Sequence, residues 1–162
     1  MRTCTDGWVQ GLDRSGLGIV HLKDKTATVV DSGNEKFQAS TLAQIGKAVA
    51  GILQHPDETA NKYVSAASFN LSENELVALV EELAGSRLAV NRVKSEDLRR
   101  AGEEKLAVGD FRGFVDLLRV HNSADGAGHG LKEGESVNEV IGLPHEDLRA
   151  AVESWLRREG AL

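Results

Sequence analysis

The feature that most constrains the fold is a regular exchange between short β-favouring runs and amphipathic helical segments. Residues 17–22 and 26–30 are two such runs joined by a charged turn, and together they predict a β-hairpin. Further strands are expected at 62–67 and 88–93. Strands that alternate with helices are typical of α/β proteins, in which helices cover a sheet. The chain is therefore expected to be an α/β mixture that ends in a cluster of helices.

Each expected helix carries a start signal. Two of the helices begin with the capping-box spacing, in which Ser or Thr is followed by Glu or Gln three residues on and provides acceptors for free N–H groups of the first turn. The start signals place the helices as follows: Thr41 with Gln44 for 42–54, Ser72 with Glu75 for a helix that stops at Gly85, Ser95 for 96–107, Asp110 for 111–121, and Pro144 for the last helix. On the 111–121 helix Phe111 and Phe114 share a face, which is expected to lie in the core.

Composition excludes several classes of protein. The chain has 162 residues, enough for one domain with a single core, and a net charge of -6, which disfavours nucleic-acid binding and docking on anionic lipid. Cys4 is the only cysteine, so no internal disulfide can form and a reducing compartment is expected. No apolar run approaches the roughly 20 residues of a membrane span. The start lacks the apolar stretch of a secretory signal, and we expect a cytoplasmic protein.

Residues 122–135 form one long segment rich in Gly, Ala, Ser and charge, and they predict a functional or mobile loop. Its Gly126–Gly130 stretch does not have the spacing of a dinucleotide fingerprint and follows a helix rather than a strand, so a flexible loop is favoured over a phosphate site. The five histidines show no metal-ligand spacing, and no metal site is expected. His121 and His129 flank the loop and are the most interesting of the five. No catalytic residue is predicted from any motif.

Several segments resemble a known family in their order and spacing. They are Asp31–Phe37, Thr41–Ala50, Leu53–Val64, Ala67–Phe69 with the helix capped by Ser72, Glu104–Leu106 with Gly109–Phe111, and Glu139–Pro144 with the last helix. Over residues 7–156 the chain resembles the C-terminal half of the NmrA-like, isoflavone-reductase-like proteins of fungi, which are atypical short-chain dehydrogenases. It differs at Gln44, where the family tends to carry an acidic helix cap, and the amide can still cap.

The resemblance implies a fold and a division of the protein. The fold is the C-terminal part of a Rossmann-type NAD(P)-binding fold with its small substrate-binding α/β subdomain. Residues 1–162 are then a single C-terminal substrate domain, and the N-terminal half, with its glycine-rich dinucleotide loop and catalytic lysine, is expected to be absent. Trp8 matches an aromatic segment near the family's substrate cleft, and Phe69 follows a strand that borders it. These two residues are the candidates for the substrate pocket.

The resemblance also implies a function. Relatives reduce small aromatic or polyketide-like compounds with NADP(H), often in secondary metabolism. The present chain is expected to be a truncated reductase that does not bind the cofactor or catalyse alone, with a small-molecule substrate or the missing Rossmann half as its partner. The alternative is a non-catalytic regulatory or protein-binding module, because some relatives sense dinucleotide and control transcription factors through protein contacts.

Overall fold

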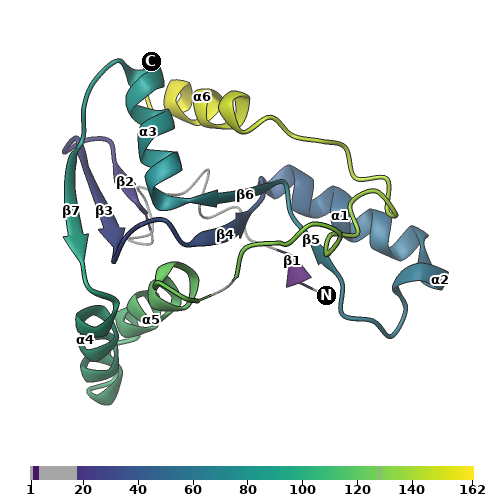
Figure 1. Cartoon of the computed structure of the whole chain (residues 1–162), viewed down its shortest axis with the longest axis horizontal. Helices are drawn as coiled ribbons and strands as arrows, with labels where there is room; N and C mark the ends of the chain where they lie inside the picture. The colour runs from purple at the N-terminus through teal and green to yellow at the C-terminus, as the bar shows by residue number, and fades with distance from the viewer. Residues whose placement is uncertain (1, 4–17, 128) are drawn as a thin grey trace.

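The computed structural model describes residues 2–3, 18–127 and 129–162, and its elements form a mixed α/β arrangement (Figure 1). The described strands are β1 (Arg2–Thr3), β2 (Val20–His21), β3 (Thr26–Val30), β4 (Lys36–Ala39), β5 (Ser65–Ala66), β6 (Phe69–Ser72) and β7 (Ala89–Val93). The described helices are α1 (Leu42–Gln54), α2 (Pro56–Thr59), α3 (Glu73–Ala84), α4 (Ser95–Ala107), α5 (Arg112–Ser123) and α6 (Leu148–Arg158).

The strands pair into three small sheets. The predicted hairpin is confirmed as the antiparallel pair β2 and β3, and β7 joins it parallel to β3, so the order is β2-β3-β7. β4 and β6 pair antiparallel, and β1 pairs parallel with β5. Strand β4 is not predicted by the sequence, and the strand expected at 62–67 is reduced to Ser65–Ala66.

The main core lies between the strands and two helices. Figure 1 shows α3 and α6 on one side of β4 and β6, with α5 on the other side, and α3 contacts both α6 and β6. The largest buried side chains of this core are Trp155, Phe37, Ile19, Leu76 and Leu156, all at most 1% exposed. A second, smaller cluster joins Ala48 of α1 to Ala66 of β5 and to Ile141.

Local signals place most helix starts. Thr41 accepts the backbone N–H of Gln44, and Ser72 and Glu75 form the reciprocal capping box that the sequence predicts. Three caps differ from expectation. Helix α5 begins at Arg112 with Phe111 as its N-cap, and not Asp110. Ser95 is the first residue of α4 rather than its cap, and its backbone N–H donates to Asp31 Oδ1 instead. The last helix begins at Leu148, where Asp147 accepts the N–H of Ala150, and not at Pro144.

Helices α4 and α5 pack closely on each other and form an arm that projects from the sheets (Figure 1). A Cβ on Gly102 would lie 2.9 Å from the carbonyl oxygen of Gly113, so the two backbones touch where both residues lack a side chain. The buried residues of α5 are Gly113, Arg119, Val120 and Ser123. Phe111 and Phe114, predicted to lie in the core, are instead 84% and 61% exposed, because the close backbone contact turns Gly113 inward. Among the described residues, no helix is both long and apolar enough to cross a membrane.

Candidate functional site

The long loop after α5 is held across β4 and β6. The side-chain amide of Gln38 on β4 donates to the carbonyl of His129 at 2.9 Å. Asn70 on β6 makes two hydrogen bonds with Leu131, donating to its carbonyl at 2.9 Å and accepting from its N–H at 3.1 Å. A Cβ on Gly130 would lie 2.6 Å from Lys36 Cβ, so the loop lies directly against strand β4. The loop expected to be flexible is therefore fastened by specific hydrogen bonds.

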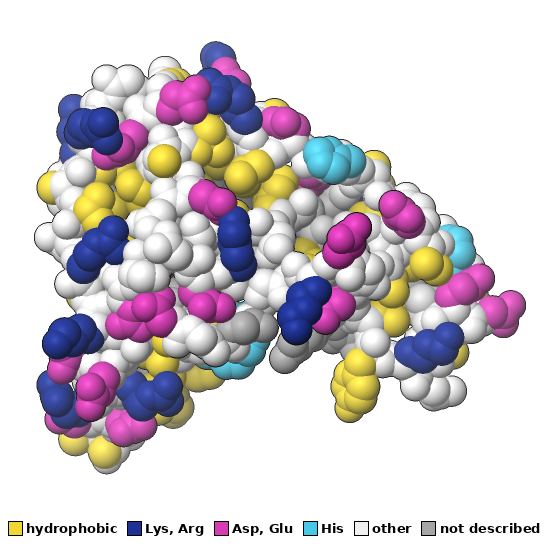
Figure 2. All heavy atoms as spheres, in the orientation of Figure 1, with side chains coloured by type: hydrophobic (Ala, Val, Ile, Leu, Met, Phe, Trp, Pro, Cys, Tyr) yellow, Lys and Arg dark blue, Asp and Glu magenta, His cyan; other side chains and the backbone are white. Residues whose placement is uncertain are grey.

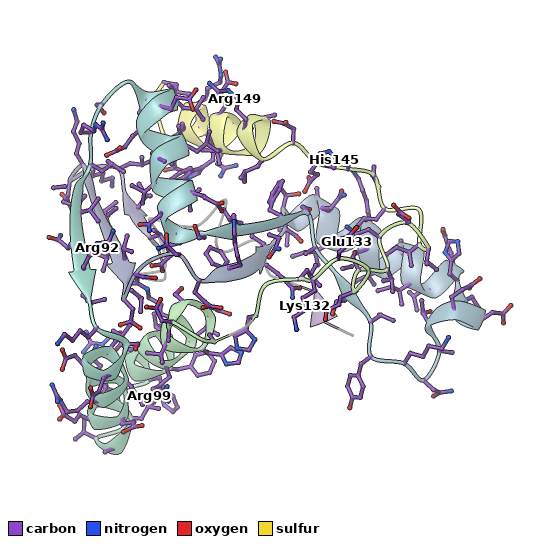
Figure 3. The ribbon with its side chains drawn as sticks, viewed as in Figure 1. Arg92, Arg99, Lys132, Glu133, His145 and Arg149 are labelled. Carbon is purple, nitrogen blue, oxygen red and sulfur yellow. The ribbon has the colours of Figure 1, made fainter. Side chains whose placement is uncertain are left out.

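The start of this loop is fastened by the turn after β3. Asp31 accepts the N–H groups of Ser95 and Asp125, and Ser32 Oγ donates to Asp125 Oδ1 at 2.6 Å. Desolvation would raise the pKa of Asp31, but the hydrogen bonds from Ser95 and Asp125 outweigh it, and the pKa is lowered. Arg92 on β7 donates to the carbonyls of Asp31 and Ser32 (Figure 3). The turn is thus a polar junction between β3, β7, α4 and the loop.

Helix α5 is anchored by a buried ion pair. Arg119 Nη2 lies 3.6 Å from Glu73 Oε1 on α3 and donates to the carbonyl of Thr28 at 2.9 Å. Glu73 Oε2 in turn accepts the N–H of Val30 at 2.6 Å. Burial raises the pKa of Glu73, against the opposing effects of the Val30 N–H and of the Arg119 charge. The pair fixes α5 to β3 and to the start of α3.

The loop brings two histidines together. The rings of His121, in the last turn of α5, and His129 have centroids 3.9 Å apart and planes tilted by 39°. Phe114 is two helical turns before His121 on α5 and therefore lies on the same side of the helix. We call Phe111, Phe114, His121 and His129 the ring stripe. Figure 2 shows histidine and hydrophobic side chains together on the surface at this end of the molecule.

A second polar cluster joins α1 to the segment before α6. Glu146 accepts hydrogen bonds from Thr41 Oγ1 at 2.6 Å and from Ser68 Oγ at 2.5 Å. A surface cavity of about 310 Å³ lies beside it, lined by Thr41, Ala43, Glu146, Asp147, Ala150, Ala151, Ser154 and Arg158. Because the Glu146 carboxylate is occupied by two hydroxyl donors, its role in the described structure is to tie three segments together.

Of the two residues predicted for the substrate pocket, only Phe69 lies within the described residues. Phe69 lies on β6, is 6% exposed and packs in the main core. Trp8 lies outside the described residues, as does Cys4. The sequence does not predict the ring stripe as a site, although His121 just before the loop and His129 within it are a signal for it. Over residues 18–127 and 129–162, no group of three His, Cys, Asp or Glu side chains is arranged to hold a metal ion.

Comparison with solved structures defines the class of fold. The chain matches an isoflavone reductase with a TM-score of 0.64 at 18% identity, over 80% of this chain and 43% of that one. It matches AtPrR2, solved with NADP+ and (+)-pinoresinol, with a TM-score of 0.64 at 19% identity, over 80% of this chain and 42% of that one. The fold is therefore that of the NAD(P)-binding, Rossmann-like reductases, which confirms the predicted fold class.

Comparison with curated proteins narrows the relationship. The chain is 43% identical over 93 residues to the oxidoreductase poxI of Penicillium oxalicum. The matched segment covers 57% of this chain and 30% of that protein. It is 28% identical over 138 residues to the oxidoreductase aprR of Aspergillus flavus, covering 85% of this chain and 46% of that protein. No protein-family model matches. The predicted resemblance to isoflavone-reductase-like proteins is confirmed, and the matches span less than half the length of either relative.

Proposed function

We propose that the chain is the substrate-binding part of an NADP(H)-dependent oxidoreductase of the isoflavone-reductase-like kind. Its substrate would be a small aromatic or polyketide-like metabolite of fungal-type secondary metabolism, reduced in the cytoplasm. The observation that carries the proposal is the 43% identity to a fungal oxidoreductase over 93 residues. The solved neighbour that holds both NADP+ and (+)-pinoresinol supports the choice of cofactor and of substrate class.

The dinucleotide site, on this proposal, lies in a further half of the reductase, and residues 1–162 form one substrate domain. Within the described part of the chain, no strand leads through a Gly-x-Gly-x-x-Gly turn into a helix, which is the element that holds a pyrophosphate. Helix α1 also keeps apolar side chains in solvent: Leu42 is 67% and Leu53 is 74% exposed. Such a helix side is suited to packing against another protein layer.

Cofactor binding and turnover test the proposal. The 162-residue chain is titrated with NADPH by nucleotide fluorescence, and NADPH oxidation is followed with aromatic ketones and quinones. The measurement is repeated after mixing with the part of the poxI oxidoreductase that the chain does not match. We expect no binding by the chain alone and NADPH oxidation by the mixture. Stoichiometric binding by the chain alone would contradict the division of the site, and an inactive mixture in which the two parts associate would contradict the reductase function.

The second candidate is a regulatory module that binds another protein. Exposed Val108 and Phe111 at the end of the α4 and α5 arm, together with Leu53 on α1, favour it. Sedimentation velocity of the chain over a range of concentrations distinguishes the two. A chain that stays monomeric at all concentrations argues against the protein-binding module.

A further inference from the structure

We propose that the free edge of strand β7 pairs with β7 of a second copy of this chain, so that two three-stranded sheets join into one. The sheet has the order β2-β3-β7, and β7 is therefore an edge strand among the described residues. Figure 1 shows β7 along the outer side of the molecule, opposite the side that holds α1. Because α1 is the helix proposed to pack against the other half of the reductase, the inference is independent of the proposed function.

The outer edge of β7 carries backbone groups that point away from its neighbour. The Ala89 N–H and the Val93 carbonyl bond to the chain at the two ends of β3, each at 2.9 Å. In a parallel ladder alternate residues bond to the same neighbour, so Ala89, Asn91 and Val93 all face β3. The N–H and C=O groups of Val90 and Arg92 therefore point outward. Such an edge is a template for a further strand.

The side chains of β7 leave this edge accessible. All of its residues except the last are exposed, and the apolar side chain of Val90 is 42% exposed. A charged side chain on an edge strand usually protects it from pairing. The Arg92 guanidinium, however, is turned back onto its own chain, where Nη1 donates to the carbonyls of Asp31 at 3.2 Å and of Ser32 at 2.8 Å. Its charge is thus held away from the free edge.

The strand complements itself when two copies run antiparallel with Asn91 on the twofold axis. Val90 of each copy then lies opposite Arg92 of the other, and each outward N–H meets an outward carbonyl. A shift by one residue would instead bring groups that already bond to β3 to the new contact. Because α4 follows the C-terminal end of β7, the twofold axis also places the two α4 and α5 arms at opposite ends of the pair.

The same pairing brings opposite charges together. Lys94, which is exposed, comes to lie opposite Leu88 of the second copy. The Leu88 N–H is bound by the Glu81 carboxylate at 2.8 Å, so the Lys94 ammonium arrives beside an anion of the other chain. Arg87, which pairs with the second oxygen of that carboxylate, lies opposite the uncharged Ser95. This charge complementarity between two copies is what selects a second copy as the occupant of the edge.

Cysteine cross-linking of the full chain tests the pairing. All variants carry Cys4→Ser, so that only the added thiol reacts. Residues that face each other in a non-hydrogen-bonded pair have Cα atoms about 4.5 Å apart, within the range of about 4.4–6.8 Å that a disulfide spans. Asn91→Cys should therefore give disulfide-linked dimers on mild oxidation. Ala89→Cys is the matched control, because its two copies would be about 13 Å apart along the strands, and it should give at least tenfold less dimer.

Proline substitution tests the hydrogen bonds. Val90→Pro removes the outward N–H and leaves the bonds between β7 and β3 in place, whereas Val90→Thr keeps both the N–H and the branched shape. The dimer loses one hydrogen bond from each copy, so Val90→Pro should raise the dimer Kd in sedimentation equilibrium at least tenfold. Val90→Thr should stay within about threefold of the parent chain. Circular dichroism and thermal unfolding establish that both variants fold.

Lys94→Glu tests the charges, and should raise the dimer Kd about three- to tenfold at low salt and less at high salt. A chain that stays monomeric, with no more cross-linking through Asn91→Cys than through Ala89→Cys, would overturn the inference. So would a dimer that Val90→Pro leaves unchanged, because the contact would then lie on another surface. None of these measurements uses NADPH, so a failure of the proposed reductase function would leave their outcome unaffected.

Discussion

Arg119 on α5 lies 3.6 Å from Glu73 at the start of α3, and both side chains are almost completely buried, at 8% and 1% exposed. Each also binds the backbone of β3, Arg119 at the Thr28 carbonyl and Glu73 at the Val30 N–H. Two residues that are 46 positions apart in the sequence thus join both helices to one strand. Together with the hydrogen bonds of Asp31 to the N–H groups of Ser95 and Asp125, this pair holds the α4 and α5 arm, and with it the ring stripe, against β3.

Replacing Arg119 should be strongly destabilising. Arg119→Met keeps the length of the side chain and leaves the Glu73 carboxylate buried without its cation, which costs about 3–5 kcal/mol in comparable pairs. Urea unfolding of the variant and the parent chain measures the difference. Arg87→Met is the control, because Arg87 pairs with Glu81 but is 92% exposed, and it should change stability by less than about 1 kcal/mol. Equal effects of the two substitutions would contradict the anchoring role of Arg119.

Local signals explain the parts of the fold that the sequence predicts. Helices α1 and α3 begin at Thr41 and Ser72 because the capping side chains and their N–H donors are three residues apart. Strand β4 escapes prediction because its four residues are held by pairing with β6, whose partner residues are 30 to 36 positions further along the chain. The ring stripe escapes prediction for a related reason. Helical spacing shows that Phe111 and Phe114 share a face, but only the contact of Gly113 with Gly102 decides that this face is exposed.

The loss of folding stability at acid pH should depend in part on Asp110. Hydrogen bonds from Arg112 lower the pKa of the Asp110 carboxyl to about 2, below the ordinary value of about 3.8. A carboxyl whose pKa is lower in the folded state stabilises above its unfolded pKa, and this contribution is lost as the pH falls towards the folded pKa. Asp110→Asn should therefore lower the urea midpoint at pH 5 and have little effect near pH 2. In NMR titrations Arg112→Ala should return the Asp110 pKa towards 3.8, and an unchanged pKa would contradict the assigned cause.

Replacing either of two glycines of α1 by alanine should change the stability of the protein, but in opposite directions. Nothing lies within 4 Å of a Cβ built on Gly46, so Gly46→Ala should stabilise the helix by about 0.5–1 kcal/mol. A Cβ on Gly51 would lie 2.7 Å from the carbonyl oxygen of Ile141, so Gly51→Ala should destabilise by about 1–3 kcal/mol. Thermal unfolding of both variants checks the pair. Stabilisation by Gly51→Ala would show that α1 does not pack on the segment around Ile141.

Gly130→Ala should release the loop and separate the two histidines. The added Cβ would lie 2.6 Å from Lys36 Cβ and 3.0 Å from Asn70 Oδ1, the atom that accepts the Leu131 N–H. The loop has to move away from β4 and β6, at a cost of about 1–3 kcal/mol. Hydrogen exchange should show faster exchange of the Leu131 amide, and NMR spectra should lose the contact between the His121 and His129 rings. Asn70→Ala removes the same hydrogen bonds without adding bulk and should change both readouts in the same direction. Retention of the ring contact in both variants would contradict the role of Gly130 and Asn70 in positioning His129.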